Sequence, residues 1–367
     1  MRRQVITAMA VLSLVAAACS GEASGAGGGG GGAPSIEAAK EQAQEFRTLG
    51  MPDDWINFGN FFTALCDEYG LGCTGSGGGP NRFDTDMSSA EEIASFKSER
   101  SNPGMCADIG IFFGQVAERE GVLIDYLPEA AKELPPQYRS KDGGWVASAV
   151  GVISFLVNED VVTNPPRTWS DLLKPEYKGL ISMSDPMTSG TGQATVVSAA
   201  AALGHGQIDL DAAFEFFRKL YQMGQINEAE FTNASFERGE TPISLRYDFV
   251  ALQAALPARE KGINATVSVP DDGAVWTPSA TMCNKNTVDP DLAKLTLDFT
   301  LSDRGQLVFA EVGARPIRWV LGDLEVPAEL QANWLPASEY ANVIEWPEDR
   351  WPDPAMIAER WESEVLG

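Results

Sequence analysis

The chain of 367 residues has one histidine, His205, and five cysteines. A serine hydrolase needs a histidine beside its nucleophile, and the sequence has no GxSxG elbow for His205 to serve. No pair of cysteines has the CxxC spacing of common zinc sites. His205 lies between two glycines after an alanine-rich run, which favours an exposed helix end over a ligand. These absences argue against Ser-His-acid catalysis.

Positive charge is also scarce. The 27 Lys and Arg residues against 52 Asp and Glu give a formal net charge of −25, which becomes −27 without Arg2 and Arg3. No basic patch survives such an excess, so nucleic acid is not an expected partner. A glycosidase that uses two carboxylates stays an alternative, although no acid pair stands out from the others.

The first residues have the pattern of an export signal. Arg2 and Arg3 precede an apolar run over 5–18, which is too short to span a bilayer as a mature helix. Small residues before Cys19 resemble a bacterial lipobox, and this resemblance implies that Cys19 is lipidated. A plain signal peptide with an incidental cysteine is the alternative. The Gly/Ser-rich stretch that follows predicts a flexible tether.

Four cysteines remain after the leader. An even number in an exported chain predicts two disulfides. Cys66 and Cys73 flank a short turn, which favours their pairing and leaves Cys106 with Cys283. Metal binding is the alternative, but the spacing does not support it.

Hydrophobic periodicity predicts alternating strands and helices along the chain. Helices are expected over 58–69, 88–99, from 115, from 193, over 209–223, from 248, over 290–301 and from 302. Strands are expected over 107–113, 145–157, 179–184 and 241–246. This alternation indicates an α/β fold with mainly parallel sheets, whose ligands bind at the carboxyl ends of the strands.

Several motifs occur in a fixed order between residues 107 and 318. They are PPRTWSDLL with PEYKG at 165–179, DPMTSGTG at 185–192, Asp289-Pro290 followed by LSDRGQ at 301–306, and GARPIR at 313–318. In this order they resemble the extracellular solute-binding proteins of ABC transporters, the two-lobed type grouped with iron(III), phosphonate, sugar-phosphate and polyamine binders. Residues 45–106 match only in general organisation, and the chain after 320 hardly at all.

The resemblance implies a two-lobed periplasmic-binding-protein-like fold in which each lobe is a mainly parallel sheet flanked by helices, with strands that cross between the lobes. The implied divisions are a signal peptide over 1–18, a lipid-anchored flexible tether over 19–44, lobe 1 over 45–150, lobe 2 over 151–270, a return crossing that completes lobe 1 over 271–320, and a C-terminal segment packing on the lobes over 321–367. The protein is then expected to be a monomer outside the cell membrane that binds a small solute without catalysis or cofactor. Its partners would be a membrane permease and, through the lipid alone, the membrane.

The short stretch Thr188-Ser189-Gly190-Thr191 lies between a predicted strand and a predicted helix. The first turn of a helix has unpaired N–H groups and a partial positive charge, so an anion binds well there. Ordinary N-capping is the alternative. Because relatives with Ser-Gly-Thr-Gly at this position often take phosphoryl or phosphonate groups, the resemblance favours an oxyanion site at these residues.

Further ligand contacts are predicted around the implied cleft. Tyr247 and Asp248 follow a predicted strand and suit an amine or hydroxyl groups, and Arg246 is a candidate anion partner. The remaining candidates are Asn57, which could equally be a helix cap, Asp86, which could equally be a surface acid, and Trp276, which could equally be a core residue.

No metal ligands are assigned. Iron(III)-binding relatives typically use adjacent tyrosines, and no Tyr-Tyr pair occurs in this sequence. Iron(III) or a polyamine therefore stays a secondary hypothesis, and an aminoalkyl phosphonate or sugar phosphate is the favoured solute.

Overall fold

The computed structural model describes residues 32–75, 79–205, 207–347 and 350–367. The predicted signal peptide, Cys19 and most of the predicted tether lie outside these residues. In the described part of the chain, no helix is both long enough and apolar enough to cross a membrane.

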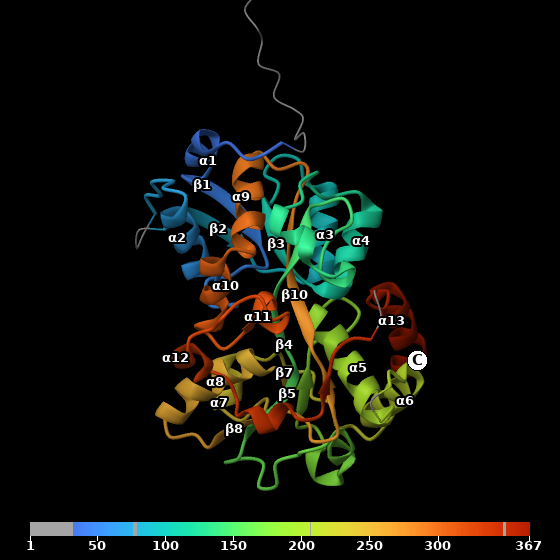
Figure 1. Ribbon diagram of the computed structural model, residues 1–367. Helices are drawn as coiled ribbons and strands as arrows, with labels where there is room; N and C mark the ends of the chain where they lie inside the picture. The colour runs from blue at the N-terminus through green and yellow to red at the C-terminus, as the bar shows by residue number, and fades with distance from the viewer. Residues whose placement is uncertain (1–31, 76–78, 206, 348–349) are drawn as a thin grey trace, which may run out of the picture.

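The two large sheets of the protein each form the centre of one lobe (Figure 1). Lobe 1 is built on a six-stranded sheet with the order β11-β4-β10-β3-β1-β2, and lobe 2 on a four-stranded sheet with the order β6-β7-β5-β8. The two-lobed α/β fold predicted from the sequence is thus confirmed.

Lobe 1 takes its elements from both halves of the chain. Its strands are β1 (Glu45–Leu49), β2 (Asn81–Thr85), β3 (Cys106–Gly110), β4 (Trp145–Gly151), β10 (Thr277–Cys283) and β11 (Arg315–Pro316). Its helices are α1 (Ile36–Gln42), α2 (Phe58–Glu68), α3 (Ser89–Ser98), η2 (Ile111–Phe113), α4 (Gly114–Glu120), η3 (Glu129–Glu133), η4 (Pro136–Tyr138), α9 (Pro290–Thr300) and α10 (Asp303–Ala310). The core between α2, α9 and α10 is aromatic: Phe61 contacts Phe299 and Phe309 at ring centroid distances of 5.0 and 5.4 Å.

Lobe 2 is continuous in sequence. Its strands are β5 (Ile153–Asn158), β6 (Ile181–Met183), β7 (Ile243–Tyr247) and β8 (Ala265–Ser268). Its helices are η5 (Trp169–Leu173), η6 (Pro175–Tyr177), α5 (Gly190–Leu203), α6 (Leu210–Gln222), α7 (Asn233–Glu237) and α8 (Asp248–Glu260). Helix α5 is buried along nearly its whole length, because its alanines and valines leave no polar face.

Two extended segments connect the lobes (Figure 1). The apolar run predicted as one strand over 145–157 is two strands, β4 in lobe 1 and β5 in lobe 2, separated at Val152. The chain returns through β9 (Ala274–Val275) into β10, which pairs antiparallel with β4. Val152 therefore marks the passage from one sheet to the other.

Both sheets are mixed and not mainly parallel as the sequence predicted, although β6 and β7 of lobe 2 pair in parallel. In lobe 1 only β1–β2 and β1–β3 pair in parallel, whereas β10 runs antiparallel to β3 and to β4. In lobe 2 the central strand β5 is antiparallel to β7 and β8. β5 enters lobe 2 from lobe 1, and β10 enters lobe 1 from lobe 2. Each is antiparallel to both of its neighbours in its sheet.

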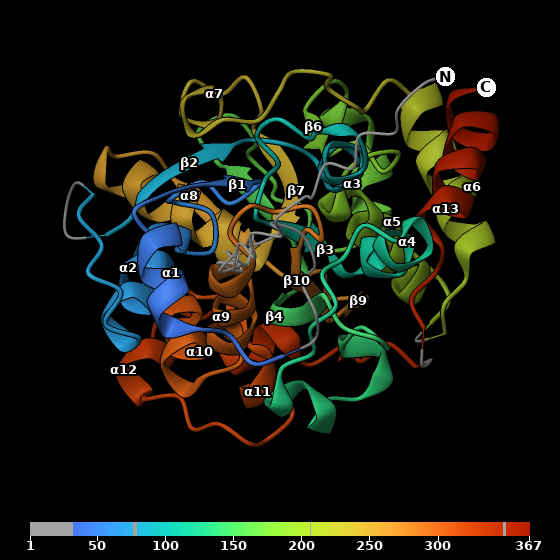
Figure 2. The ribbon, with the colours of Figure 1, turned by 90° about the horizontal axis from the view of Figure 1, so that it is seen from above.

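The C-terminal segment contacts both lobes. It contains α11 (Ile317–Val320), α12 (Ala328–Gln331), η7 (Ala337–Tyr340), β12 (Val343–Ile344), α13 (Pro354–Arg360) and the π-helix η8 (Trp361–Leu366). Trp351 meets Phe112 of lobe 1 at 5.2 Å, and Trp361 meets Phe217 of lobe 2 at 5.1 Å, measured between ring centroids. Figure 2 shows α13 beside α6.

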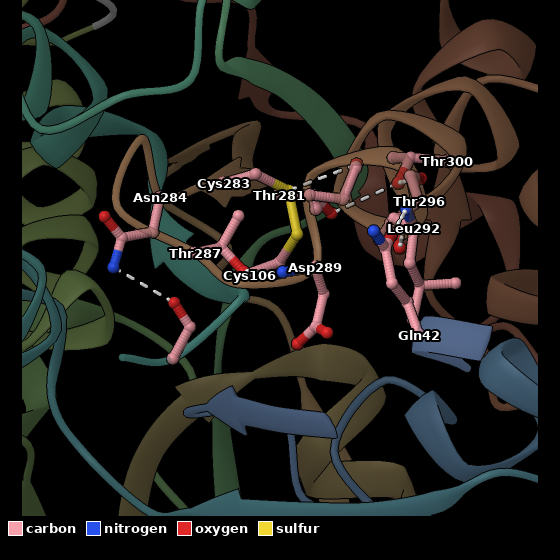
Figure 3. Close-up of a disulfide and its surroundings, with 12 residues drawn as sticks. Gln42, Cys106, Thr281, Cys283, Asn284, Thr287, Asp289, Leu292, Thr296 and Thr300 are labelled. Atoms are coloured by element: carbon pink, nitrogen blue, oxygen red, sulfur yellow. Dashed lines mark hydrogen bonds between the residues drawn. A yellow bond between two sulfur atoms is a disulfide. The ribbon is translucent and has the colours of Figure 1, made fainter. Parts of the chain in front are cut away.

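Both predicted disulfides are formed. Cys66–Cys73 closes the turn after α2, and Cys106–Cys283 joins directly opposed residues of β3 and β10. Figure 3 shows the second disulfide with Asp289, the N-cap residue of α9, close to it. The bond fixes the strand that returns from lobe 2 to the centre of the lobe 1 sheet.

The last residues of the predicted tether are structured. Residues 36–42 form α1, which Ser35 caps by accepting a hydrogen bond from Ala38 N–H. The backbone N–H of Ser35 donates to the carboxylate of Asp291 on α9 at 2.7 Å. The chain is thus attached to lobe 1 from Ser35 onward.

Candidate functional site

A cavity of about 480 Å³ lies between the lobes. Lobe 1 contributes Asp54, Trp55, Asp86, Ser88, Asp108 and Ser279 to its wall, among others. Lobe 2 contributes Ser189, Gly190, Thr191, Phe231, Arg246 and Tyr247, among others. The cavity wall is of mixed polar and apolar character, and both sheets present the ends of strands to it.

The N-terminus of α5 forms part of the lobe 2 wall. The helix begins at Gly190, three residues before the predicted start, so Thr191 belongs to its first turn. The hydroxyl of Ser189 is the N-cap and accepts a hydrogen bond from Gly192 N–H at 3.4 Å. The first turn of a 14-residue helix therefore faces the cavity with its partial positive charge and with the Thr191 hydroxyl.

The N-terminus of α3 approaches the same region from lobe 1. Ser88 and Glu91 form the capping box expected from the sequence, and Ser88 and Ser89 line the cavity. The backbone N–H of Ala90 donates to the carbonyl of Thr188 at 3.2 Å across the two lobes. Two helix N-termini, one from each lobe, thus meet at one side of the cavity.

The lobes touch through two glycines at this point. A β-carbon built on Gly110 would lie 2.5 Å from the α-carbon of Gly190, and one built on Gly190 would lie 2.5 Å from the α-carbon of Gly110. No side chain fits into this contact. Glycine at both positions allows α5 to reach the end of β3.

Arg246 supplies a positive charge to the cavity. Its guanidinium carbon lies 3.6 Å from the centre of the Phe231 ring, and its Nε donates to the Ser244 hydroxyl at 3.0 Å. It makes no ion pair with any described carboxylate. Burial lowers the pKa of Arg246 to about 9, against a weaker raising effect of Glu230. A half-buried cation that pairs with no carboxylate of the described chain favours the entry of an anion.

Asp108 and Tyr247 lie at the floor of the cavity. Asp108 is 7% exposed, and its Oδ2 accepts a hydrogen bond from Trp55 Nε1 at 2.6 Å. Its Oδ1 accepts no hydrogen bond of standard geometry in the described chain, although the Ser279 hydroxyl is close enough to lower the pKa of the carboxyl. Burial raises the pKa of Asp108 to about 8, although the bond from Trp55 opposes this shift. The Tyr247 hydroxyl is also buried and makes no hydrogen bond of standard geometry to the described residues, although the Thr277 hydroxyl is close to it.

Beyond Arg246 and Phe231, a second hollow of about 680 Å³ shares seven wall residues with this cavity. Its other wall residues include Asp185, Tyr221, Glu228, Glu230, Trp361 and Leu366. The C-terminal π-helix η8 therefore forms part of its wall.

Five of the nine predicted ligand-binding residues line the cavity: Asp86, Ser189, Gly190, Thr191 and Tyr247. Asp108 was not predicted, since a single aspartate after an apolar strand gives no sequence signal. Arg246 was named as an anion partner, and it is at the cavity wall.

Four predicted residues are elsewhere. Asn57 is buried under α10, where its amide donates to Val308 O and to Glu311, and Thr188 contributes its carbonyl to the lobe contact. Asp248 is fully buried and pairs with Arg315 at 2.7 Å. Trp276 stacks on Tyr340 at 5.3 Å and lines a separate hollow with Arg315 and Trp334. Their hydrogen bonds and ring contacts give these four residues structural roles.

Among the residues that the structure covers, no group of three or more His, Cys, Asp or Glu side chains is placed to hold a metal ion. His205 has a positive φ of 54° after the end of α5 and does not line the cavity.

Two α/β lobes joined by crossing strands, with a polar cavity between them, define a binding protein of the two-lobed type. The chain belongs to the family described as bacterial extracellular solute-binding protein, whose family model matches residues 107–347. The match includes the N-terminus of α5, Arg246 and Asp108.

Two curated relatives are similar to the chain at low sequence identity. The chain is 25% identical over 233 residues to an uncharacterised protein of Haemophilus influenzae, which covers 59% of this chain and 64% of that protein. It is 24% identical over 187 residues to a "Putative 2-aminoethylphosphonate-binding periplasmic protein" of Salmonella typhi, covering 47% of this chain and 52% of that protein. The chain thus spans about half to two thirds of the length of these relatives.

Solved structures share the fold. The periplasmic binding protein AfuA of Actinobacillus pleuropneumoniae, with fructose-6-phosphate bound, matches with a TM-score of 0.66 at 19% identity, over 88% of this chain and 98% of that one. Iron-bound HitA of Pseudomonas aeruginosa matches with a TM-score of 0.61 at 20% identity, over 86% and 98% of the two chains. At these identities the likeness extends to the fold alone.

Proposed function

We propose that the protein is the solute-binding lipoprotein of an ABC importer, which captures a small oxyanion-bearing solute of the phosphonate or sugar-phosphate type between its lobes. It then delivers this solute to a membrane permease. The observation that carries the proposal is that Arg246, a half-buried cation with no ion pair to the described residues, shares one cavity with the N-terminus of α5. An oxyanion would accept hydrogen bonds from both.

The lobes suit capture by closure. Contacts at Gly110–Gly190 and between Ala90 and Thr188 join the lobes beside the proposed oxyanion position. Two helix N-termini carry partial charges of the same sign, so an anion between them favours the approach of the lobes. Binding and closure are coupled in this proposal.

Relatives support the solute class. The Salmonella relative is named for 2-aminoethylphosphonate, and AfuA was solved with fructose-6-phosphate. Both compounds carry a tetrahedral oxyanion on a short polar chain, which fits a polar cavity of about 480 Å³.

A polyamine is the second candidate, because three aspartates line the cavity: Asp54, Asp86 and Asp108. The N-terminus of α5 and Arg246 oppose a bare cation at the other wall. A thermal-shift panel separates the two. It contains 2-aminoethylphosphonate, fructose-6-phosphate, spermidine and ferric citrate. A compound that binds only the folded protein raises the Tm of the protein.

We expect a rise in Tm with at least one of the two oxyanions and none with spermidine. A rise with spermidine or ferric citrate alone would contradict the proposal. Incubation of the stabilising solute with the protein should leave it unchanged, and steady product formation at catalytic rates would show an enzyme instead.

The lipid anchor at Cys19 is part of the proposal. It rests on the small residues before this cysteine and on the Gly/Ser-rich stretch after it. Cys19→Ser should release the protein from the cell surface to the soluble fraction, and an unchanged membrane fraction would exclude the anchor.

A further inference from the structure

We propose that the solute also carries a primary ammonium group, which binds between Asp108 of lobe 1 and Tyr247 of lobe 2. This inference rests on the proposed oxyanion-binding function. It gives the cavity two poles, with Arg246 and the N-terminus of α5 at one and the pair Asp108–Tyr247 at the other. The solute class is then a zwitterionic amino-oxyanion.

Asp108 is the acceptor at this pole. Its Oδ1 is buried and accepts no hydrogen bond of standard geometry in the described chain, although the Ser279 hydroxyl is close enough to the carboxylate to lower its pKa, and Trp55 occupies Oδ2. A buried acceptor without a donor is unfavourable, and a ligand donor would relieve it. Because Trp55 orients the carboxylate, Oδ1 is held in one position at the cavity wall.

Tyr247 is the second acceptor. It comes from β7 of the opposite lobe, and its ring is fixed by stacking on Phe249 at 5.4 Å. Its hydroxyl makes no hydrogen bond of standard geometry in the described chain, although the Thr277 hydroxyl is close enough to lower its pKa. Burial raises the pKa of Tyr247 and the charge of Asp108 adds to this shift, so the two groups lie within electrostatic reach of each other. An ammonium group has several N–H donors and can bond to both oxygens at once.

Charge balance favours an ammonium group over a hydroxyl. Apart from Asp108, the cavity wall contains the two carboxylates of Asp54 and Asp86 against the single cation Arg246. An oxyanion would add negative charge to a wall that already has an excess of it. A positive group on the same ligand restores the balance, whereas a hydroxyl group does not.

The protonation of Asp108 gives a second signature. Burial raises the pKa of Asp108 to about 8, and Asp84 adds to this shift, so the carboxyl is largely protonated near pH 7. Glu92 faces it from α3, and the pKa of Glu92 is raised well above its usual value by burial and by Asp108. An ammonium ion next to Asp108 would favour the carboxylate, and its proton would pass to the buffer.

The test compares two probes that differ in one group. In 2-aminoethylphosphonate an ammonium stands where n-propylphosphonate has a methyl group. We expect the wild-type protein to bind the first at least tenfold more tightly by isothermal titration. Asp108→Asn should reduce this ratio about tenfold or more, with little change for n-propylphosphonate, and Tyr247→Phe should reduce it less. Asp142→Asn, an exposed residue outside the cavity, removes the same charge and should leave the ratio unchanged.

The outcomes separate this inference from the function on which it rests. Equal binding of both probes by the wild-type protein would overturn the ammonium pole and keep the oxyanion site, as expected if Asp108 and Tyr247 simply bond to each other. Binding of neither probe, together with no response to fructose-6-phosphate, would overturn the proposed function itself. If Asp108→Asn does not fold, the wild-type protein is titrated at pH 7 in two buffers of different ionisation enthalpy, which measures the protons released on binding. We expect proton release with 2-aminoethylphosphonate and none with n-propylphosphonate. The absence of proton release with 2-aminoethylphosphonate would contradict the proposal.

Discussion

Arg315 and Asp248 form a buried ion pair of 2.7 Å that joins the two lobes. Arg315 belongs to β11 at the edge of the lobe 1 sheet, whereas Asp248 begins α8 in lobe 2. Tyr340 donates its hydroxyl to the same carboxylate oxygen, and the other oxygen accepts from Val152 N–H in the crossing segment. Asp248 thus connects both lobes, the crossing strand and the C-terminal segment.

Removal of Arg315 should therefore destabilise the protein. Arg315→Met leaves the Asp248 carboxylate buried without its cation, and we expect a loss of about 3–5 kcal/mol in the free energy of unfolding. The matched control is Arg304→Met, because Arg304 pairs at the surface with Asp67 and Glu68 and should contribute less than about 1 kcal/mol. Urea unfolding measures both, and equal losses would contradict the role given to this pair.

The two disulfides should differ in their contribution to stability. They close loops with sequence separations of 7 and 177 residues. The chain-entropy relation gives about 2.5 kcal/mol for Cys66–Cys73 and about 5 kcal/mol for Cys106–Cys283. Paired Cys→Ser variants compared by urea unfolding test this order. Thiol counting on the denatured protein from Ser35 onward should find no free thiol, and four free thiols would exclude both bonds.

Stability should depend on pH through Asp289. This carboxyl is 8% exposed beside the Cys106–Cys283 disulfide, and burial raises its pKa to about 6 from an unfolded value of 3.8. The folded state holds the proton more tightly, so this contribution to stability is present below pH 3.8 and is lost as the pH rises to 6. Asp289→Asn should therefore gain roughly 1–3 kcal/mol relative to wild type between pH 4 and pH 7.5. A constant difference across this range would contradict the assignment.

The contact between Gly110 and Gly190 predicts an effect on closure. A methyl group at Gly110 cannot fit against Gly190, so Gly110→Ala should hold the lobes apart. The affinity for a solute falls in proportion to the closed fraction, and a loss of roughly tenfold or more is expected. Small-angle X-ray scattering with saturating solute should give a larger radius of gyration than wild type. Wild-type compaction and affinity in this variant would show that the contact is dispensable.

Local signals in the sequence predicted much of the fold. The capping box at Ser88 and Glu91, the N-cap Asp209 of α6 and Pro290 in the first turn of α9 each depend on a few neighbouring residues. The break at Val152 and the antiparallel crossing strands were missed, because they depend on which lobe each strand joins.

The site was predicted only in part, because some of its residues are marked by local sequence features and others come together only in the folded chain. The anion position follows from the helix start near Ser189, which is a local feature. Tyr247 and Asp248 are adjacent in sequence, but the first lines the cavity and the second turns to Arg315. Asp108 lines the same cavity as Tyr247 but lies 139 positions earlier in the chain, so the two are recognisable as neighbours only when both lobes are assembled.

The most direct test of the oxyanion site is isothermal titration of 2-aminoethylphosphonate and fructose-6-phosphate into wild type, Thr191→Val and Arg246→Met. Each substitution removes a donor and keeps the approximate shape of the side chain. Bonds to a charged group contribute about 1.5–3 kcal/mol, so each variant should lose about one to two orders of magnitude in affinity for whichever compound binds. Thr195→Val, one turn further along α5 and outside the cavity, should bind as wild type does. Unchanged affinity in Thr191→Val and Arg246→Met, with both variants folded, would contradict an oxyanion at the N-terminus of α5.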